Sequence, residues 1–157
     1  MILASWRPLA AAAALGAALV SPAAAQDGAE LGFQFTTLLR DTPFYGAGVS
    51  AAYRTAGRVR IAFGGLYGIA DESATIRAEL AGHFMASPAR RGGVGIYALG
   101  GAGFEAGWRD QGYLILGLGL ETNPAGGNGF HLEAGVGGGV RLSAGWRTRW
   151  LGTSGGP

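Results

Sequence analysis

Residues 112–121 read GYLILGLGLE, and this stretch decides the fold class. Leucine occupies every second position from 114 to 120. Successive side chains of a β-strand point to opposite faces, so this alternation is typical of a strand and not of a helix. The stretch therefore predicts a strand with one continuous apolar face.

The same alternation recurs in seven further segments, which are separated by turn residues. Proline, which cannot donate a ladder hydrogen bond, occurs after residue 26 only between the segments or in the tail, as a sheet requires. No stretch after residue 26 reaches the ~18 apolar residues of a transmembrane helix. The eight strands that we expect are 30–39, 45–54, 58–70, 74–85, 93–108, 112–121, 130–137 and 140–150.

The two faces of these segments differ in kind. One face carries only apolar residues, such as those at 61, 63, 116 and 132, and no charge. A register shift of one residue would exchange the faces, so their agreement over eight segments supports the strand assignment. The opposite face is rich in glycine and carries Glu30, Gln34, Ser50, Arg54, Arg58, Arg60, Arg77, Glu79, His83, Glu105, Glu121, His131, Glu133, Arg141, Ser143, Arg147 and Arg149.

The apolar face points inward in a soluble barrel and outward to lipid in a membrane barrel. The polar face lacks lysine, is poor in serine and threonine, and is rich in glycine, which a solvated strand disfavours. These features favour the membrane barrel, and a soluble periplasmic lipocalin-like binding barrel is the alternative. Aromatic residues near the expected strand ends are typical of membrane-interface girdles, namely Tyr53, Tyr67, Phe84, Phe130, Trp146 and Trp150.

The first 25 residues have the layout of a cleaved signal peptide. Arg7 precedes an apolar run, and the small residues Ala23-Ala24-Ala25 form an A-x-A cleavage site. No cysteine follows that could carry a lipid anchor. We therefore expect a barrel domain over 26–150 and a disordered tail over 151–157.

An open sheet edge is excluded in hydrocarbon, because every backbone N–H and C=O there needs a partner. The mature length suits eight strands, the smallest count among bacterial membrane barrels. The sequence thus predicts an all-β fold, a closed antiparallel transmembrane β-barrel of eight strands in an up-and-down meander. The outer membrane of a Gram-negative bacterium is the expected location.

In this architecture, over residues 30–150, the chain resembles the small eight-stranded outer-membrane barrels, the class of the OmpA transmembrane domain, OmpX and the opacity-type proteins. The last strand, Ser143 to Trp150, resembles the terminal signal of that class, with a polar residue, a glycine and an aromatic end. The resemblance implies folding by the barrel assembly machinery, which would bind this strand. It implies no particular activity.

The charges of the polar face are expected to pair and fill the lumen, because an unpaired buried charge is costly. This interpretation is favoured over carboxylate catalysis, so we expect a non-catalytic protein in a structural or surface-interaction role. The expected lumen charge network consists of Arg60, Arg77, Glu79, Glu105, Glu121, His131, Glu133 and Arg141.

A lipid-modifying, deacylase-type enzyme is the catalytic alternative. Barrels of that kind place histidine and serine two residues apart, and no His-x-Ser occurs in this chain. Its two histidines, His83 and His131, are fewer than the three or four ligands of a usual metal site, so neither metal nor cofactor is expected. The formal charge of +2 includes Arg7 and gives no case for nucleic acid. We expect a monomer in outer-membrane lipid, with a lumen too narrow for an open pore.

Overall fold

The computed structural model describes residues 28–55, 57–88 and 92–151. The expected signal peptide and residues 152–157 of the tail lie outside this described part of the chain. Within it, no helix is long and apolar enough to cross a membrane.

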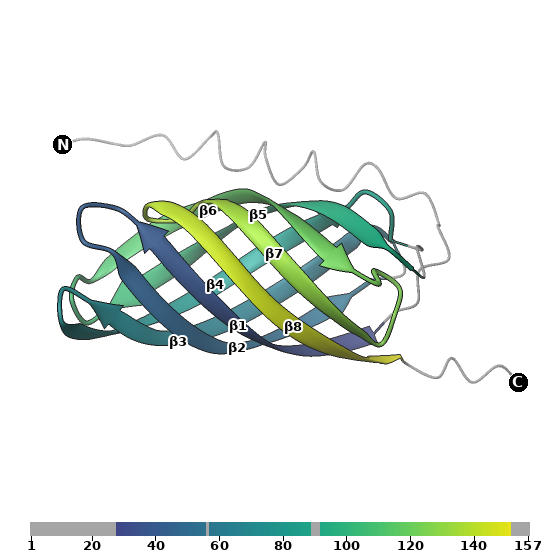
Figure 1. Cartoon of the computed structure of the whole chain (residues 1–157), viewed down its shortest axis with the longest axis horizontal. Helices are drawn as coiled ribbons and strands as arrows, with labels where there is room; N and C mark the ends of the chain where they lie inside the picture. Colours follow the sequence, from purple (N-terminus) through teal and green to yellow (C-terminus); the bar gives the residue numbers. More distant parts are fainter. Residues whose placement is uncertain (1–27, 56, 89–91, 152–157) are drawn as a thin grey trace, which may run out of the picture.

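The described residues form a closed antiparallel barrel of eight strands (Figure 1). Each strand pairs with the next along the chain, and the last closes the barrel on the first. The all-β, up-and-down fold predicted from the alternation is therefore confirmed. The strands are β1 (Gly28–Leu39), β2 (Phe44–Arg54), β3 (Val59–Ala70), β4 (Ser73–Met85), β5 (Val94–Ala106), β6 (Gln111–Thr122), β7 (Asn128–Val136) and β8 (Val140–Leu151).

The strand boundaries differ from the expected ones by one or two residues. Strand β5 ends at Ala106, two residues before the expected end at Trp108. Gly107 has a φ of 120°, a conformation that leaves the extended chain. Trp108 is thereby released from the strand and packs across the end of the barrel.

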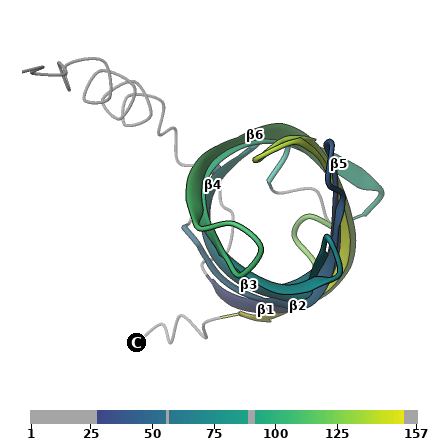
Figure 2. The same cartoon turned by 90° about the vertical axis from the view of Figure 1, so that its left-hand side faces the viewer.

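The barrel has its apolar side outside. Leu114 and Leu116 of β6 are 67% and 61% exposed, whereas Ile115 between them is 1% exposed. Large apolar side chains are exposed on all eight strands, while charged side chains are buried inside the ring of strands seen in Figure 2. The facing assignment holds with one exception. Arg58 was expected to face inward, but it precedes the first residue of β3 and its side chain is exposed at the rim.

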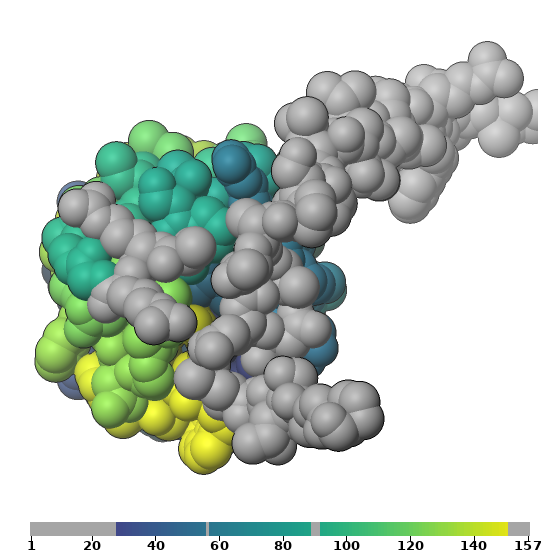
Figure 3. Space-filling view, turned by 90° about the vertical axis from the view of Figure 1, so that its right-hand side faces the viewer, coloured from purple at the N-terminus to yellow at the C-terminus, as the bar shows by residue number. Residues whose placement is uncertain are grey.

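The two ends of the barrel differ in their connections. At the turn end, on the left of Figure 1, residues 40–43, 71–72, 107–110 and 137–139 join the strands. Asp71 and Glu72 both have positive φ (51° and 59°), as a tight two-residue hairpin turn requires. At the terminus end lie residues 55, 57–58, 86–88, 92–93 and 123–127, together with the first residue of β1 and the last of β8. Figure 3 views the molecule from this end.

Candidate functional site in the barrel lumen

The charged side chains inside the barrel form two groups, one toward each end. We call them the turn-end cluster and the terminus-end cluster. The turn-end cluster consists of Arg40, Arg77, Glu79, Glu105, Glu133 and Arg141. The terminus-end cluster consists of Glu30, Arg54, Arg60, Glu121, Arg147 and Arg149.

In the turn-end cluster, three arginines face three glutamates. Arg77 and Glu105 lie opposite each other on β4 and β5, and Arg77 Nη1 donates to Glu105 Oε2 at 2.7 Å. Arg40 donates to the other oxygen of Glu105 at 2.8 Å. Arg141 donates to Glu133 at 2.6 Å and to Glu79 at 3.1 Å. Every carboxylate of this cluster thus accepts from at least one guanidinium.

In the terminus-end cluster, four arginines face two glutamates. Arg60 Nη1 donates to Glu121 Oε2 at 2.8 Å and to Glu30 Oε2 at 3.3 Å. Arg149 Nε donates to Glu30 Oε1 at 2.6 Å, and Arg147 Nε donates to Glu121 Oε2 at 3.2 Å. Arg54 has only a distant ionic contact, 3.9 Å from Glu121 Oε1. This cluster has a formal excess of two positive charges, four minus two.

Backbone carbonyls serve as acceptors where carboxylates are too few. The carbonyl of Pro124, in the β6–β7 connection, accepts from both Arg54 and Arg149. The neighbouring carbonyl of Asn123 accepts from Arg147 Nη2 at 3.2 Å. Pro88, in the β4–β5 connection, accepts from Arg54 Nη2 at 3.2 Å. Two connections therefore contact the lumen arginines at the terminus end, and both prolines are buried.

A polar path joins the two clusters. Arg60 Nε donates to His83 Nδ1 at 3.1 Å, and the His83 ring stacks on Tyr97 with centroids 5.1 Å apart. The Tyr97 hydroxyl donates to Glu133 Oε1 at 2.7 Å. His131 faces Glu121 across β6 and β7. The interior polar groups thus connect the two halves of the barrel.

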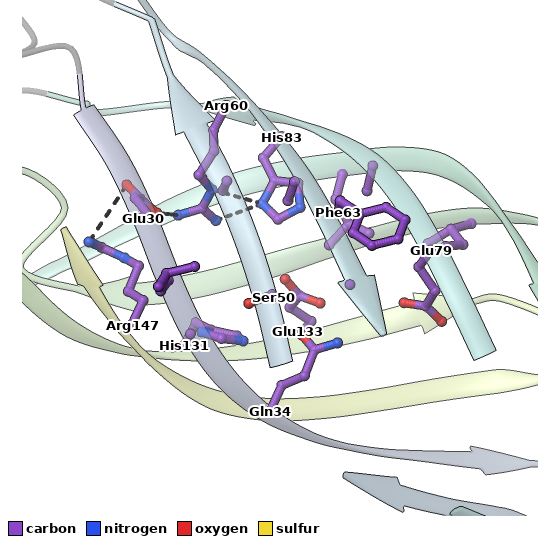
Figure 4. A pocket seen from close by; sticks show the side chains of 18 of the residues that line it. Glu30, Gln34, Ser50, Arg60, Phe63, Glu79, His83, His131, Glu133 and Arg147 are labelled. Atoms are coloured by element: carbon purple, nitrogen blue, oxygen red, sulfur yellow. Dashed lines mark hydrogen bonds and ion pairs between the residues drawn. The ribbon is translucent and has the colours of Figure 1, made fainter. Parts of the chain in front are cut away.

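A small polar cavity of about 50 Å³ lies in the middle of the lumen. Side chains from several strands line it, among them Gln34, Ser50, His83 and His131 (Figure 4). Since a buried water needs about 10–15 Å³ of such space, the cavity has room for a few waters. Arg147, which belongs to the terminus-end cluster, also lines it.

Apolar side chains also face the lumen, and some were not anticipated from the sequence. Leu38, Phe44, Leu66 and Ala70 pack together, with Trp108 against them. A second group contains Met85, Tyr97, Leu99 and Ile115, with Tyr113 beside it. Apolar residues precede or follow several of these positions, such as Leu39 and Tyr45, so the alternation does not reveal which of two apolar neighbours faces inward.

Two inward glycines make room for aromatic rings. A Cβ added at Gly119 would collide with the Tyr97 ring, and one added at Gly103 would collide with the Tyr113 ring. The Tyr113 hydroxyl donates to Glu79 at 3.1 Å, so the rings carry part of the hydrogen bonding in the lumen. These two glycines therefore leave space for tyrosine rings inside the barrel.

Five of the six aromatic residues expected at the membrane interfaces lie on one half of the wall. Tyr53, Phe84, Phe130, Trp146 and Trp150 are exposed on the half of the wall toward the terminus end. Tyr67 lies toward the turn end, 64% exposed, and Tyr45, which the sequence analysis did not select, joins it at 61%. An interface role for these side chains remains an expectation.

Among the described residues, no group of three or more His, Cys, Asp or Glu side chains is placed to hold a metal ion. The glutamates of both clusters accept from arginine, so their carboxylates are occupied by ion pairs. This arrangement suits structural charge pairing.

No protein-family model matches the chain, and no curated protein matches it. Solved structures do. The N-terminal β-barrel domain of Pseudomonas aeruginosa OprF has 13% identity and a TM-score of 0.53, over 80% of this chain and 100% of that one. Neisserial surface protein A (NspA) has 14% identity and a TM-score of 0.53, over 79% of this chain and 97% of that one. The Yersinia pestis outer membrane protein Ail has 14% identity and a TM-score of 0.48, over 80% of this chain and 100% of that one.

The chain has the fold of the small eight-stranded outer-membrane barrels. The architectural resemblance noted from the sequence is thereby confirmed. At this level of identity the likeness concerns the fold alone.

Proposed function

We propose that this protein is a non-catalytic β-barrel of the outer membrane, with a structural or surface-interaction role. The observation that carries the proposal is the inverted distribution of side chains. Apolar residues are exposed on all eight strands, and charged residues are buried inside. Contact of that apolar surface with water is unfavourable, whereas contact with hydrocarbon is not, because lipid tails are equally apolar.

The proposal also states how the chain is exported, assembled and stabilised. A signal peptide over 1–25 directs export, and the strand from Ser143 to Trp150 is bound by the barrel assembly machinery. The lumen charge network and the interface aromatics stabilise a monomer in lipid. The interior of an eight-stranded barrel is just wide enough for its own side chains, so the lumen is closed and does not conduct steadily.

Fractionation and electrophoresis test the proposal together. The protein, expressed with its first 25 residues, should fractionate with the outer membrane. A sample kept cold in detergent should migrate differently from a boiled one, because a closed barrel resists detergent unfolding. Recovery as a soluble periplasmic protein would favour the lipocalin-like alternative.

A substitution in β6 tests which face meets lipid. Leu116→Arg should destabilise the folded barrel by about 2–4 kcal/mol, as arginine does near the bilayer midplane. Leu120→Arg is the matched control, because Leu120 faces outward on the same strand but lies near its end, where arginine costs about 0–1 kcal/mol. Urea unfolding in lipid vesicles measures both. Equal costs for the two variants would argue against a lipid-facing wall.

A further inference from the structure

The terminus-end cluster has more charge than its acceptors neutralise. Arg54, Arg60, Arg147 and Arg149 are each at most 6% exposed, and among the described residues only Glu30 and Glu121 lie among them as anions. Burying a net charge inside a barrel wall is costly unless a counter-charge accompanies it. At the turn end the numbers of arginines and glutamates are equal, so the excess is confined to one half.

The acceptors that replace carboxylates are neutral. Two guanidiniums, those of Arg54 and Arg149, converge on the single carbonyl oxygen of Pro124. A carbonyl carries only a partial charge, so an anionic acceptor attracts a guanidinium more strongly and can also form a bidentate pair with it. An oxyanion would therefore be a better acceptor for these two guanidiniums than the single carbonyl oxygen.

Two donors in this cluster have no hydrogen-bond acceptor within the described part of the chain. They are Arg54 Nε and Arg147 Nη1, and both atoms are buried. Glu121 Oε1 of the same cluster also has no hydrogen-bond partner, and the turn-end cluster has two such donors, Arg77 Nε and Arg141 Nε, so the net charge and not the unused donors distinguishes the terminus end. Arg147 Nη1 lies 3.8 Å from Glu30 Oε1, too far for a hydrogen bond, and its side chain also lines the central cavity. Unused buried donors on cations indicate capacity for one more anionic acceptor.

We propose that a small oxyanion of phosphate size, free in water, binds at the terminus end of the lumen to Arg54, Arg147 and Arg149. It would take the place of the carbonyls of Asn123 and Pro124. The β6–β7 connection would then move away from the arginines. Gly126 and Gly127 give this connection the backbone freedom to move. A lipid headgroup is a poorer fit, because its acyl chains would have to follow the phosphate into the lumen.

The first test measures anion-dependent stability of the full barrel in detergent without phospholipid. Sodium phosphate and sodium chloride are compared at equal ionic strength, since salt alone screens exposed charges. Phosphate should raise the midpoint of the heat-dependent electrophoretic transition, and the shift should saturate with concentration, as for a ligand that binds the folded state. Phosphatidylglycerol added to the detergent should not reproduce it. No shift, or an equal shift with chloride or with the lipid, would overturn the proposal.

Two variants test whether the phosphate-dependent shift of the midpoint arises from the terminus-end cluster. Arg149→Gln should lose most of the phosphate-dependent shift. Arg58→Gln is the matched control, because Arg58 is an exposed arginine of the same end, and it should keep the shift. An undiminished shift in Arg149→Gln would place the anion elsewhere and overturn the site.

A labelling experiment remains decisive if Arg149→Gln fails to fold. The chain has no cysteine, so Ala125→Cys introduces one thiol into the β6–β7 connection. Phosphate should speed its reaction with a water-soluble maleimide several-fold, because the connection leaves the arginines. Thr42→Cys, also half-buried but at the turn end, should react at an unchanged rate. An unchanged or slower reaction of Ala125→Cys would overturn the displacement of the connection, and with it the proposed site.

Discussion

The turn-end cluster sets three arginines against three glutamates, whereas the terminus-end cluster sets four arginines against two and uses backbone carbonyls for the rest. The turn end is further closed by an apolar group that includes Phe44 and Leu66, with Trp108 over it. The terminus end is closed by connections that contact the arginines. Connection carbonyls accept from arginines at both ends, those of Gly137 and Gly138 at the turn end and that of Pro124 at the terminus end. The two halves therefore differ in their number of carboxylates and in the apolar group that closes the turn end.

The comparison predicts that removing a single charge destabilises the barrel most in the turn-end cluster, where arginines and glutamates are equal in number. Arg77 is fully buried and donates to Glu105, to Glu79 and to the carbonyl of Gly137. Arg77→Ala removes one guanidinium partner from each of two carboxylates, which leaves Glu105 with Arg40 and Glu79 with Arg141. Removing one member of a buried ion pair costs about 3–5 kcal/mol. Reversible urea unfolding in vesicles measures this loss.

Arg58→Ala serves as the control for Arg77→Ala, since its side chain is exposed at the rim. Substitutions at such exposed sites change stability by about 0.5 kcal/mol or less. Similar values for the two variants would mean that the balanced cluster contributes little to stability.

A double-mutant cycle tests the coupling within the same cluster. Glu133→Ala should destabilise the barrel by leaving Arg141 poorly paired, and Arg141→Ala in addition should recover part of the loss. We expect an interaction energy of about 0.5–3 kcal/mol, the usual range for residues in one network. Recovery is partial because Arg141 also contacts Glu79, and Glu133 also accepts from Tyr97.

A second cycle across the two clusters is the control for this coupling. Glu133→Ala and Arg149→Ala remove side chains that share no hydrogen-bond partner among the described residues, so their effects should add. Additivity in the first cycle as well would show that Glu133 and Arg141 do not interact despite their 2.6 Å contact.

The sequence predicts the arginine contacts of a lumen half only where the acceptors are side chains on strands. Alternation places Arg77 opposite Glu105 once the hairpin register is known, because both side chains come from strands. Alternation also predicts the fold, since the leucines at 114, 116, 118 and 120 identify the apolar face of the strand. No side-chain pattern, however, shows that the Pro124 carbonyl would meet Arg54 and Arg149.

The errors of the sequence analysis have physical causes of the same kind. Arg58 obeys the alternation but lies before the first residue of β3, so its side chain reaches solvent. Arg40 lies in a connection, where alternation says nothing, yet it reaches Glu105. Leu38 and Phe44 face inward beside apolar neighbours that face outward, and hydropathy alone does not separate them.

The smallest effect that we expect distinguishes the two halves most directly. Arg54 and Arg77 are both fully buried, but the nearest carboxylate of Arg54 is 3.9 Å away and like charges surround it. Arg54→Gln reduces the excess of positive charge in its cluster from two to one. The relief of repulsion offsets the lost hydrogen bonds to carbonyls, so the net cost should be about 1 kcal/mol or less. Arg77→Gln, the same change in the balanced cluster, leaves two carboxylates underpaired and should cost several times more in the same urea titration. Equal costs would mean that the Pro88 and Pro124 carbonyls compensate the charge of Arg54 as fully as Glu105 compensates that of Arg77, and the distinction between the halves would not hold.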